Sequence, residues 1–377
     1  MIADVCIVGA GVLGASTAWH LARRGVKRVI LVDPEPAGGS TARATGGFRA
    51  TYASAINVRL SLLSRAKLLR FQDETGFDPG FRPVGYLWLA RSAADLARLE
   101  AALAVQRAAG ADDSRLVGVE EIAELNPAVT DTQVVGGLFG AGDGTLRPLA
   151  VLSGYLEDAR RRGGAEVVRE RAVGLIGSDR VLGVKTEKQA IAADTVVLAA
   201  GAWTGAFARS AGVDVPITPL RRQIAETEPC PLPGDMPMTL WLDDGFHLRV
   251  RDGRALLLCP SPGAADPFDT SVEPGWVDDV ARSAGERVRG LGDVAIARSW
   301  GGLYDMSPDG HALLGSVPGR PGLFVVGGTS GHGVMHAPAL GQLLAERIVL
   351  GAAHALDARP LALERFAEGR AHAHDPL

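Results

Sequence analysis

Cysteine is scarce in this chain, and its three cysteines lie far apart. Cys6, Cys230 and Cys259 show no spacing typical of metal ligands and too few thiols for a framework of disulfides. Disulfide-stapled proteins and clustered zinc sites are therefore excluded, and we expect no metal. The pattern fits a reducing compartment, so we expect a cytoplasmic protein.

Long apolar runs and a strong net charge are also missing. No segment is long enough to span a membrane, and the apolar run at 5–8 is too short for a signal-peptide core. With 39 basic and 43 acidic residues, the net charge of -4 gives no electrostatic basis for binding nucleic acid or an anionic membrane. We expect a small-molecule partner, and the sequence leaves open a homo-oligomer or a subunit of a hetero-oligomer.

The chain does contain enough apolar material for two packed cores, since 47% of its 377 residues are hydrophobic and 22% are charged. Its first segment predicts a strand, a turn and a helix. An apolar run at 4–8 ends at glycine, helical spacing covers 15–24, and a second apolar run covers 29–32 before Asp33. This β-α-β unit has the length of a dinucleotide-binding fold.

The rest of the chain alternates between two predicted domains. Helical spacing covers 61–71, 93–109, 119–125, 149–163 and 340–350, and strand patterns cover 84–90, 166–168, 172–176, 195–199, 246–250, 255–259 and 323–326. The expected fold class is α/β (α+β overall), with a Rossmann-like nucleotide domain at 1–82, 142–215 and 300–377. A discontinuous antiparallel-sheet substrate domain takes 83–141 and 216–299. The tail with His372 and His374 is expected to be frayed and solvated.

The first motif is the run Gly9-Ala10-Gly11-Val12-Leu13-Gly14 between the predicted strand and helix. The first glycine permits the tight turn, the second lets the backbone approach a pyrophosphate, and the third allows helix and strand to pack closely. The helix N-terminus offers unpaired N–H groups to phosphate. Asp33 ends the second strand, where a carboxylate can accept hydrogen bonds from ribose hydroxyls.

Two further loops of small residues favour a flavin over NAD. The loop at 38–49 follows Asp33 directly, and a bare NAD fold has no evident use for it. A flavin must thread its long ring system past backbone, which small residues allow. A third loop, at 327–335, lies between a strand and the last helix, and would bring another helix N-terminus to the cofactor.

With these motifs the chain resembles the FAD-dependent oxidoreductases that include D-amino-acid oxidase, glycine oxidase, sarcosine oxidase and dimethylglycine dehydrogenase. The resemblance covers nearly the whole chain and is closest to the β-subunit type of sarcosine oxidase. Its other carriers are the segments 199–203 (AAGAW), 298–304 (RSWGGLY) and 307–310 (SPDG). The resemblance implies FAD-dependent oxidation of a small amine or amino acid of the sarcosine, glycine, proline or N-methyl amino acid type, by hydride transfer from the carbon next to nitrogen.

The resemblance also implies site residues. Arg49 matches a carboxylate-binding arginine, Tyr52 could line the same pocket, and Arg298 matches the arginine that opens the penultimate motif, with a salt bridge at a strand start as its alternative. His332 is expected beside the flavin, or else as a cap of the following helix. Weaker candidates are Arg249, whose direction on its strand is open, His247, His336, Trp203 and Trp300.

The predicted FAD-binding residues come from the three loops and the matched segments. They are Gly9, Gly11, Val12, Leu13, Gly14, Asp33, Ser40, Thr41, Arg43, Gly46, Gly47, Val173, Ala200, Gly201, Trp203, Gly301, Gly328, Gly331, His332, Gly333, Val334 and Met335.

Two departures from the family pattern limit what carries over. No cysteine lies between Arg298 and Tyr304, where a relative attaches its flavin, so we expect a noncovalent FAD. No lysine follows Lys188, so the lysine that promotes reaction with oxygen is missing, and we expect another electron acceptor to serve. The remaining alternatives are an FAD-dependent 2-hydroxy-acid dehydrogenase, the flavin subunit of a multi-component dehydrogenase complex, and an NAD-dependent enzyme.

Overall fold

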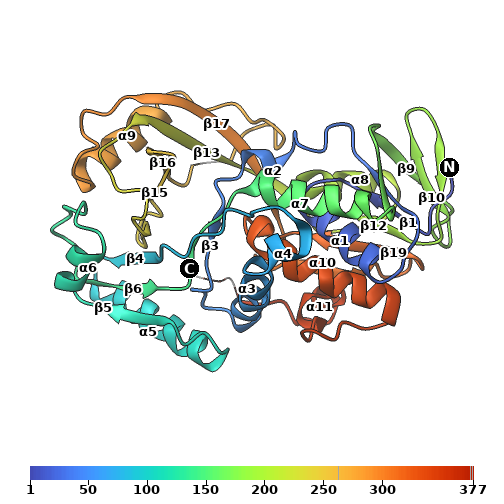
Figure 1. Ribbon diagram of the computed structural model, residues 1–377, viewed down its shortest axis with the longest axis horizontal. Helices are drawn as coiled ribbons and strands as arrows, with labels where there is room; N and C mark the ends of the chain where they lie inside the picture. The colour runs from blue at the N-terminus through green and yellow to red at the C-terminus, as the bar shows by residue number, and fades with distance from the viewer. Residues whose placement is uncertain (262, 374, 376) are drawn as a thin grey trace.

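The computed structural model describes residues 1–261, 263–373, 375 and 377, and builds them around two large sheets (Figure 1). The first sheet has six strands in the order β18-β19-β12-β1-β2-β8. Its strands are β1 (Val5–Val8), β2 (Val29–Val32), β8 (Ala165–Val168), β12 (Val196–Leu198), β18 (Leu313–Ser316) and β19 (Leu323–Gly327). All pairs are parallel except β18 with β19.

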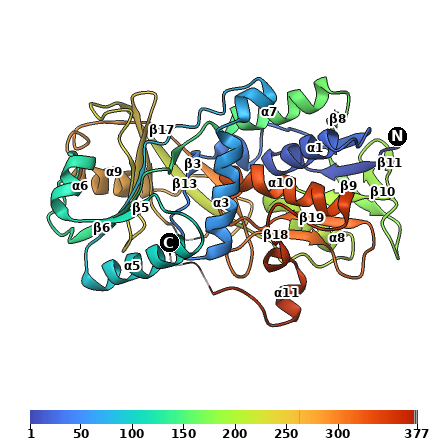
Figure 2. The ribbon, with the colours of Figure 1, turned by 60° about the horizontal axis from the view of Figure 1, so that its bottom comes forward.

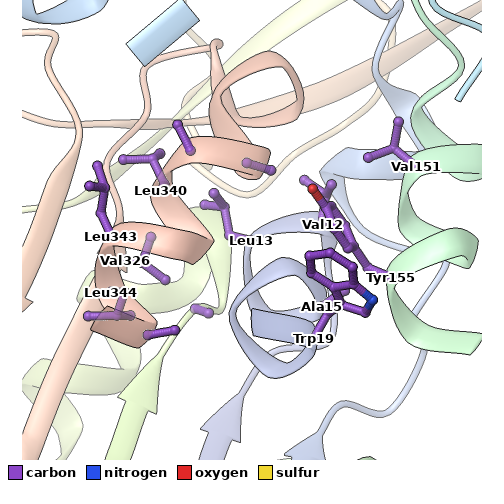
Figure 3. Close-up of a cluster of buried hydrophobic side chains, with 14 of the residues drawn as sticks. Val12, Leu13, Ala15, Trp19, Val151, Tyr155, Val326, Leu340, Leu343 and Leu344 are labelled. Atoms are coloured by element: carbon purple, nitrogen blue, oxygen red, sulfur yellow. The ribbon is translucent and has the colours of Figure 1, made fainter. Parts of the chain in front are cut away.

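Helices and a small sheet cover the two faces of this parallel sheet. On one face lie α1 (Val12–Arg23), α7 (Pro148–Arg161) and α10 (Gly333–Leu350), and Figure 3 shows Leu13 of α1 toward α10 and Trp19 toward α7. The other face packs on α8 (Thr204–Ser210) and on the small sheet of β9 (Ala172–Ile176), β10 (Gly183–Thr186) and β11 (Ala190–Ala192). Strands buried on both faces are apolar throughout, which explains the uninterrupted hydrophobic runs of β1 and β2.

The second sheet has eight strands in the order β17-β13-β16-β15-β14-β4-β6-β5. They are β4 (Tyr86–Ala90), β5 (Ser114–Val117), β6 (Gly136–Gly140), β13 (Thr218–Pro229), β14 (Met238–Trp241), β15 (His247–Arg251), β16 (Arg254–Leu258) and β17 (Ile296–Met306). The predicted fold class is confirmed, with one exception to the antiparallel order: β4 and β14 run parallel. Those strands come from two separate chain segments, which meet at this pair.

Each face of the second sheet has its own helices. Leu87 and Leu89 of β4 point into a core shared with α6 (Val119–Leu125) and α9 (Trp276–Arg287). Tyr86 and Trp88 alternate to the opposite face, where they meet α5 (Ala93–Ala108). This second face also looks toward the parallel-sheet body.

The remaining elements lie outside the two large sheets. They are α2 (Ser40–Arg43), β3 (Gly47–Phe48), α3 (Ala55–Leu68), α4 (Phe71–Thr75), β7 (Gly144–Thr145), a 3₁₀ turn at Gly201–Trp203, a second at Arg359–Leu361, and α11 (Glu364–Ala367). The division into two domains stays a proposal, and its boundary at 299/300 falls inside β17, which runs unbroken to Met306. Among the described residues, no helix combines the length and apolarity needed to cross a bilayer.

The end of the chain departs from expectation. His372 is half-buried, its ring stacks on His311 at 4.3 Å, and its Nε2 lies 2.8 Å from the Pro360 carbonyl, so the prediction of a frayed, solvated tail is wrong here. His374 lies outside the described residues. Figures 1 and 2 both place the C-terminus between the two bodies, away from α11.

Candidate active site

The turn from β1 into α1 requires its glycines. Gly9 has φ +106°, and a Cβ on it would lie 2.4 Å from the Ala199 carbonyl oxygen. A Cβ on Gly14 would lie 2.1 Å from the Gly9 oxygen, so strand and helix approach too closely for a side chain. The helix has no side-chain bond from its N-cap and no acidic residue in its first turn, so its first N–H groups, apart from that of Val12, which donates to the Thr41 hydroxyl, are left to an anion.

Asp33, at the end of β2, is fixed beside this turn. Its Oδ2 accepts a hydrogen bond from the N–H of Ala10 at 2.8 Å, and its Oδ1 accepts one from Glu35 at 2.8 Å. The Asp33 carboxylate thus lies next to the glycine turn, where it could accept hydrogen bonds from the ribose of a bound dinucleotide.

The second loop joins the first loop to β17. The hydroxyl oxygen of Thr41 accepts from the N–H of Val12 at 3.2 Å, Ser40 donates to the Leu303 carbonyl at 2.7 Å, and Arg43 donates to the Gly301 carbonyl at 2.7 Å. These bonds hold α2 across the gap between the two bodies.

The third loop closes the site from the other side. Gly331 has φ +95°, and a Cβ on it would lie 2.4 Å from the ring of Tyr304 on β17. Helix α10 begins directly afterwards, again without a side-chain cap or an acidic residue in its first turn. A second helix N-terminus therefore opens at this loop.

All three loops line one cavity of about 840 Å³. The predicted residues that line it are Gly9, Gly11, Val12, Leu13, Asp33, Ser40, Thr41, Arg43, Gly46, Gly47, Arg49, Ala200, Gly201, Trp203, Gly331, His332, Gly333, Val334 and Met335. A groove with an uncapped helix N-terminus and a carboxylate at one end, and a wall of small residues leading to a second helix N-terminus, fits an extended dinucleotide such as FAD.

Six predicted residues do not line the cavity. Gly14 packs α1 on β1, as described above, and Gly328 packs beside Leu313 and Ser307. Gly301 faces Thr270 while its neighbour Gly302 lines the cavity, because successive strand residues point to opposite faces. Val173 is 45% exposed, and its neighbours Arg171 and Ala172 line the cavity instead. The other two, Tyr52 and Arg298, are described below.

Arg49 lines the cavity beside Trp88, His332 and Leu377. Its side chain is 6% exposed, and its guanidinium stacks over the Tyr52 ring at 3.8 Å and near Trp88 at 5.0 Å. Nη1 donates to the Thr51 carbonyl at 2.7 Å, and Nη2 donates to the main-chain oxygen of Leu377 at 2.9 Å. Among the described residues, no Asp or Glu side chain pairs with it.

Tyr52 does not line the cavity, and its ring instead packs against the Arg49 guanidinium. Its side chain is fully buried, and its hydroxyl contacts the Met335 sulfur at 3.1 Å. Burial raises the pKa of Tyr52 above its ordinary range, so the phenol stays protonated.

His332 meets the guanidinium edge and lines the cavity. Arg49 Nη2 lies 3.3 Å from His332 Nε2, and because arginine can only donate, this nitrogen is the acceptor and Nδ1 carries the proton. Burial, and then the charge of Arg49, lower the pKa of His332 well below its usual value. The ring is therefore neutral.

Arg298 is not brought to the site. Its side chain is 63% exposed and forms a two-point ion pair with Glu226, with bonds of 3.1 and 2.9 Å. It shares a strand face with Gly302 and Tyr304, but six residues along β17 separate it from Tyr304, roughly 20 Å. The structure therefore has the salt bridge that was the alternative for Arg298. The prediction that Arg298 binds the substrate carboxylate is wrong.

The second sheet contributes cavity residues that sequence analysis missed or ranked low. These are Tyr86, Trp88, Arg222, Ile224, Met238, Leu240, Leu242, His247, Leu258, Gly302, Tyr304 and Asp305, besides Arg171 and Leu377. The alternating pattern of the strands allowed either face to be the inner one, and only their pairing decides it. Trp300 lies outside the lining, where its indole N–H donates to the Arg43 carbonyl at 3.1 Å.

A buried polar cluster positions the backbone around Arg49. Asp143 accepts from the Ala50 N–H at 2.6 Å and from the Thr51 hydroxyl at 2.9 Å, and burial raises its pKa to about 7. Ser61 donates to the Arg49 carbonyl at 2.6 Å, so His336 Nε2, 2.9 Å from the Ser61 oxygen, is the donor to it. His336 thus supports Arg49 from α10.

Within the described part of the chain, no group of acidic, histidine or cysteine residues is arranged to hold a metal ion. The three cysteines are free, and none lines the cavity.

Comparisons with known proteins agree with this geometry. Residues 4–347 match the family model described as FAD dependent oxidoreductase. Glycine oxidase of Geobacillus kaustophilus is 28% identical over 96% of this chain and 97% of its own length. Mitochondrial dimethylglycine dehydrogenase of Mus musculus is 27% identical over 93% of this chain, which spans 42% of that longer protein.

Solved structures give the same result. L-proline dehydrogenase from P. horikoshii superposes with a TM-score of 0.91 at 25% identity, covering 98% of this chain and 99% of that one. Glycine oxidase from Geobacillus kaustophilus superposes with a TM-score of 0.85 at 26% identity, covering 97% and 99%. The chain belongs to the FAD-dependent oxidoreductase family, and its cofactor is FAD.

Proposed function

We propose that this enzyme oxidises a small amino acid or N-substituted amino acid at the carbon next to nitrogen. One observation carries the proposal: a buried guanidinium, Arg49, lines the cavity beside Trp88 and His332, and no Asp or Glu side chain among the described residues pairs with it. A buried charge without an acidic side chain beside it is costly, and a substrate carboxylate would compensate it through two charge-assisted hydrogen bonds.

The chain's own residues would bind and orient the substrate. FAD supplies the hydride acceptor. Arg49 would hold the carboxylate in the place where the Leu377 oxygen now accepts from Nη2. Stacking on Tyr52 and the bond to Thr51 fix the guanidinium plane, so little orientation is lost on binding.

His247 would hold the amine. Its Nδ1 lies 2.9 Å from the Gly245 carbonyl and donates to it, which leaves Nε2 as a hydrogen-bond acceptor. Burial lowers the pKa of His247 to about 4, so the ring is neutral and accepts a bond from a substrate N–H without adding charge. Leu240, Leu242 and Leu258 line the same region and keep water away from the reacting carbon.

The names of the relatives support this substrate class. Two of them are glycine oxidase and dimethylglycine dehydrogenase, and a neighbouring structure is an L-proline dehydrogenase. All three names denote oxidation of an amino acid or N-methyl amino acid.

The test is anaerobic reduction of the bound flavin. The purified yellow protein is mixed without oxygen with glycine, sarcosine, dimethylglycine, proline and acidic amino acids, and with 2-hydroxy acids as the comparison. We expect at least one amine to bleach the flavin and the hydroxy acids to leave it oxidised. Bleaching by hydroxy acids alone would overturn the proposal.

We also propose that the FAD is held noncovalently, since no cysteine lines the cavity. Acid precipitation should leave the yellow chromophore in the supernatant, and colour retained in the pellet would contradict this.

For the electron acceptor we propose a molecule other than oxygen. Stopped-flow reoxidation by air as fast as turnover would contradict that assignment.

A further inference from the structure

The substrate end of the cavity carries more positive charge than one carboxylate neutralises. Besides Arg49, Arg222 on β13 lines the cavity. Its Nη1 reaches only the carbonyls of Arg221 at 3.4 Å and Ser261 at 3.5 Å, and its guanidinium lies 5.7 Å from the Tyr304 ring centroid. Within the described ranges, no acidic side chain forms an ion pair with it.

A third guanidinium borders the same region. Arg249 is 1% exposed, and none of its three guanidinium nitrogens has a hydrogen-bond partner among the described residues. Arg249 and His247 are two residues apart on β15 and so share one face of the strand, and His247 lines the cavity. The Nη1 of Arg249 lies 3.9 Å from the position that a Cβ on Gly47 would take. The wall formed by Gly47 and Met238 adjoins it.

All three cations act on the same phenol. The charges of Arg222, Arg49 and Arg249 each favour ionisation of Tyr304, although burial outweighs them and raises its pKa. The acidic residues that line the cavity are elsewhere or engaged: Asp33 and Glu35 lie at the nucleotide turn, and Asp305 accepts from the Thr329 hydroxyl at 2.7 Å. The imbalance belongs to the substrate end.

Resting on the proposed function, we infer that the substrate carries a second acidic group and is a dicarboxylic amino acid or N-substituted dicarboxylic amine. Arg49 holds the carboxylate next to the amine, and Arg222 holds the second, with Arg249 adding positive potential from behind the wall. Arg249 is buried and Arg222 is half-buried, and no acidic side chain of the described residues pairs with either. Positive charge held away from water without counter-charge is unfavourable, and a second carboxylate would reduce that cost in the bound state.

The test uses matched substrate pairs on the FAD-loaded enzyme. N-methylglutamate is compared with N-methylglutamine, and glutamate with glutamine, each as both enantiomers, by anaerobic flavin bleaching. Binding without oxidation is measured by calorimetry with glutarate and its monoamide. The acid should be preferred over its amide by about tenfold to a hundredfold.

Variants assign the preference to Arg222. In Arg222→Gln the acid-to-amide ratio should fall toward one in both bleaching and calorimetry. The control Arg254→Gln, an arginine of the same sheet paired with Glu228 at 3.0 Å, should keep the wild-type ratio. Because calorimetry needs no turnover and folding is checked by flavin content, a variant that misfolds is recognised as such, and Arg222→Lys then replaces it, with a partial ratio expected.

The outcomes separate the two proposals. Amides or monocarboxylic amines that bind and bleach as well as the diacids overturn the inference and leave the proposed function standing. A ratio unchanged in Arg222→Gln, or in Arg222→Lys where that variant replaces it, also overturns it. If no amine of either kind bleaches the flavin, the proposed function fails, and the inference that rests on it fails too.

Discussion

Among single residues, Arg49 is the one whose position matters most for substrate binding. Its plane is fixed by two aromatic rings, and its carbonyl by Ser61, which is in turn bonded to His336. The arginine therefore combines a rigid position with a charge that no Asp or Glu side chain of the described residues pairs with, which is the arrangement expected for recognition of a carboxylate.

Arg49→Lys tests that role. Lysine keeps the charge but cannot form two parallel bonds, so we expect kcat/KM for the best amine to fall by about 30- to 1000-fold, or roughly 2–4 kcal/mol. Steady-state kinetics would measure it, with flavin content as the check on folding. A loss under threefold would place carboxylate recognition elsewhere.

His336 gives a prediction for pH. Burial, and then the charge of Arg49, lower the pKa of His336 to about 3, whereas an unfolded histidine has a pKa near 6.5. Below about pH 6.5 the unfolded chain binds a proton that the folded chain refuses, so stability falls as the pH falls toward 3.

His336→Gln removes this titration while keeping a donor for Ser61. Urea unfolding at pH 7 and pH 5.5 should show that the variant loses about 1.2 kcal/mol less than wild type over this interval. Equal losses in both proteins would contradict this, since they would mean that the His336 ring binds protons equally in the folded and unfolded chains.

At the scale of elements, the site is made of three loops that are far apart in sequence and meet around one cavity. Each loop contains a glycine, Gly9, Gly46 or Gly331, at which a side chain would not fit. This predicts that cofactor binding fails when one of these contacts is blocked.

Gly9→Ala is the sharpest such change. The new methyl group would lie 2.4 Å from the Ala199 oxygen, so β1 and the following turn must move, and we expect most of the FAD to be lost on purification. The control is Gly25→Ala, which has a similar positive φ of +86° but open space around it. It should cost only about 1–2 kcal/mol and keep its FAD. Full FAD content in Gly9→Ala would contradict the role of the turn.

Elements differed in how well the sequence predicted them. The buried strands β1, β2 and β19 and the helix α6 were found because their apolar patterns are local. Helix α10 begins at Gly333, seven residues before the predicted start, because its first turns hold glycine and Pro338. The long strand β13 was hidden in a proline-rich stretch, and its pairing with β17 brings Arg222 and Gly302 together.

The site was predictable to the same degree. Residues of the three loops were found from their motifs, while Tyr86, Arg222 and Tyr304 were missed because nothing local says which face of a strand looks inward. Arg298 was misplaced for a related reason: a matching motif does not fix how far along β17 the cavity extends.

At the scale of the whole molecule, a buried ion pair anchors the C-terminal segment. Arg365 and Asp309 are 0% and 3% exposed and pair at 2.8 Å, and Asp309 also accepts from the His372 N–H at 3.1 Å. From this anchor the chain returns to the cavity, where Leu377 meets Arg49. The Arg365–Asp309 pair therefore holds the segment that leads to Leu377 and the active site.

Asp309→Asn should destabilise the protein by about 3–5 kcal/mol, because it leaves the Arg365 charge buried without a partner.

Burial opposes ionisation of Asp309, but the bonds from Arg365 and His372 outweigh it and lower its pKa. Its contribution to stability is thus complete above about pH 4 and is lost as the pH falls further. Urea unfolding measures both effects. Asp357→Asn, at the exposed pair with Arg359, is the control and should change nothing measurable. An Asp309→Asn protein as stable as wild type would contradict the anchor.

The most direct measurement of the central claim is a crystal structure of the FAD-loaded enzyme with a bound carboxylate inhibitor. In that structure we expect the flavin ring in the part of the cavity lined by Gly46, Gly47 and Gly331, and the inhibitor carboxylate on Arg49 with the Leu377 oxygen displaced. A ring outside that region, or a carboxylate bound away from Arg49, would contradict it.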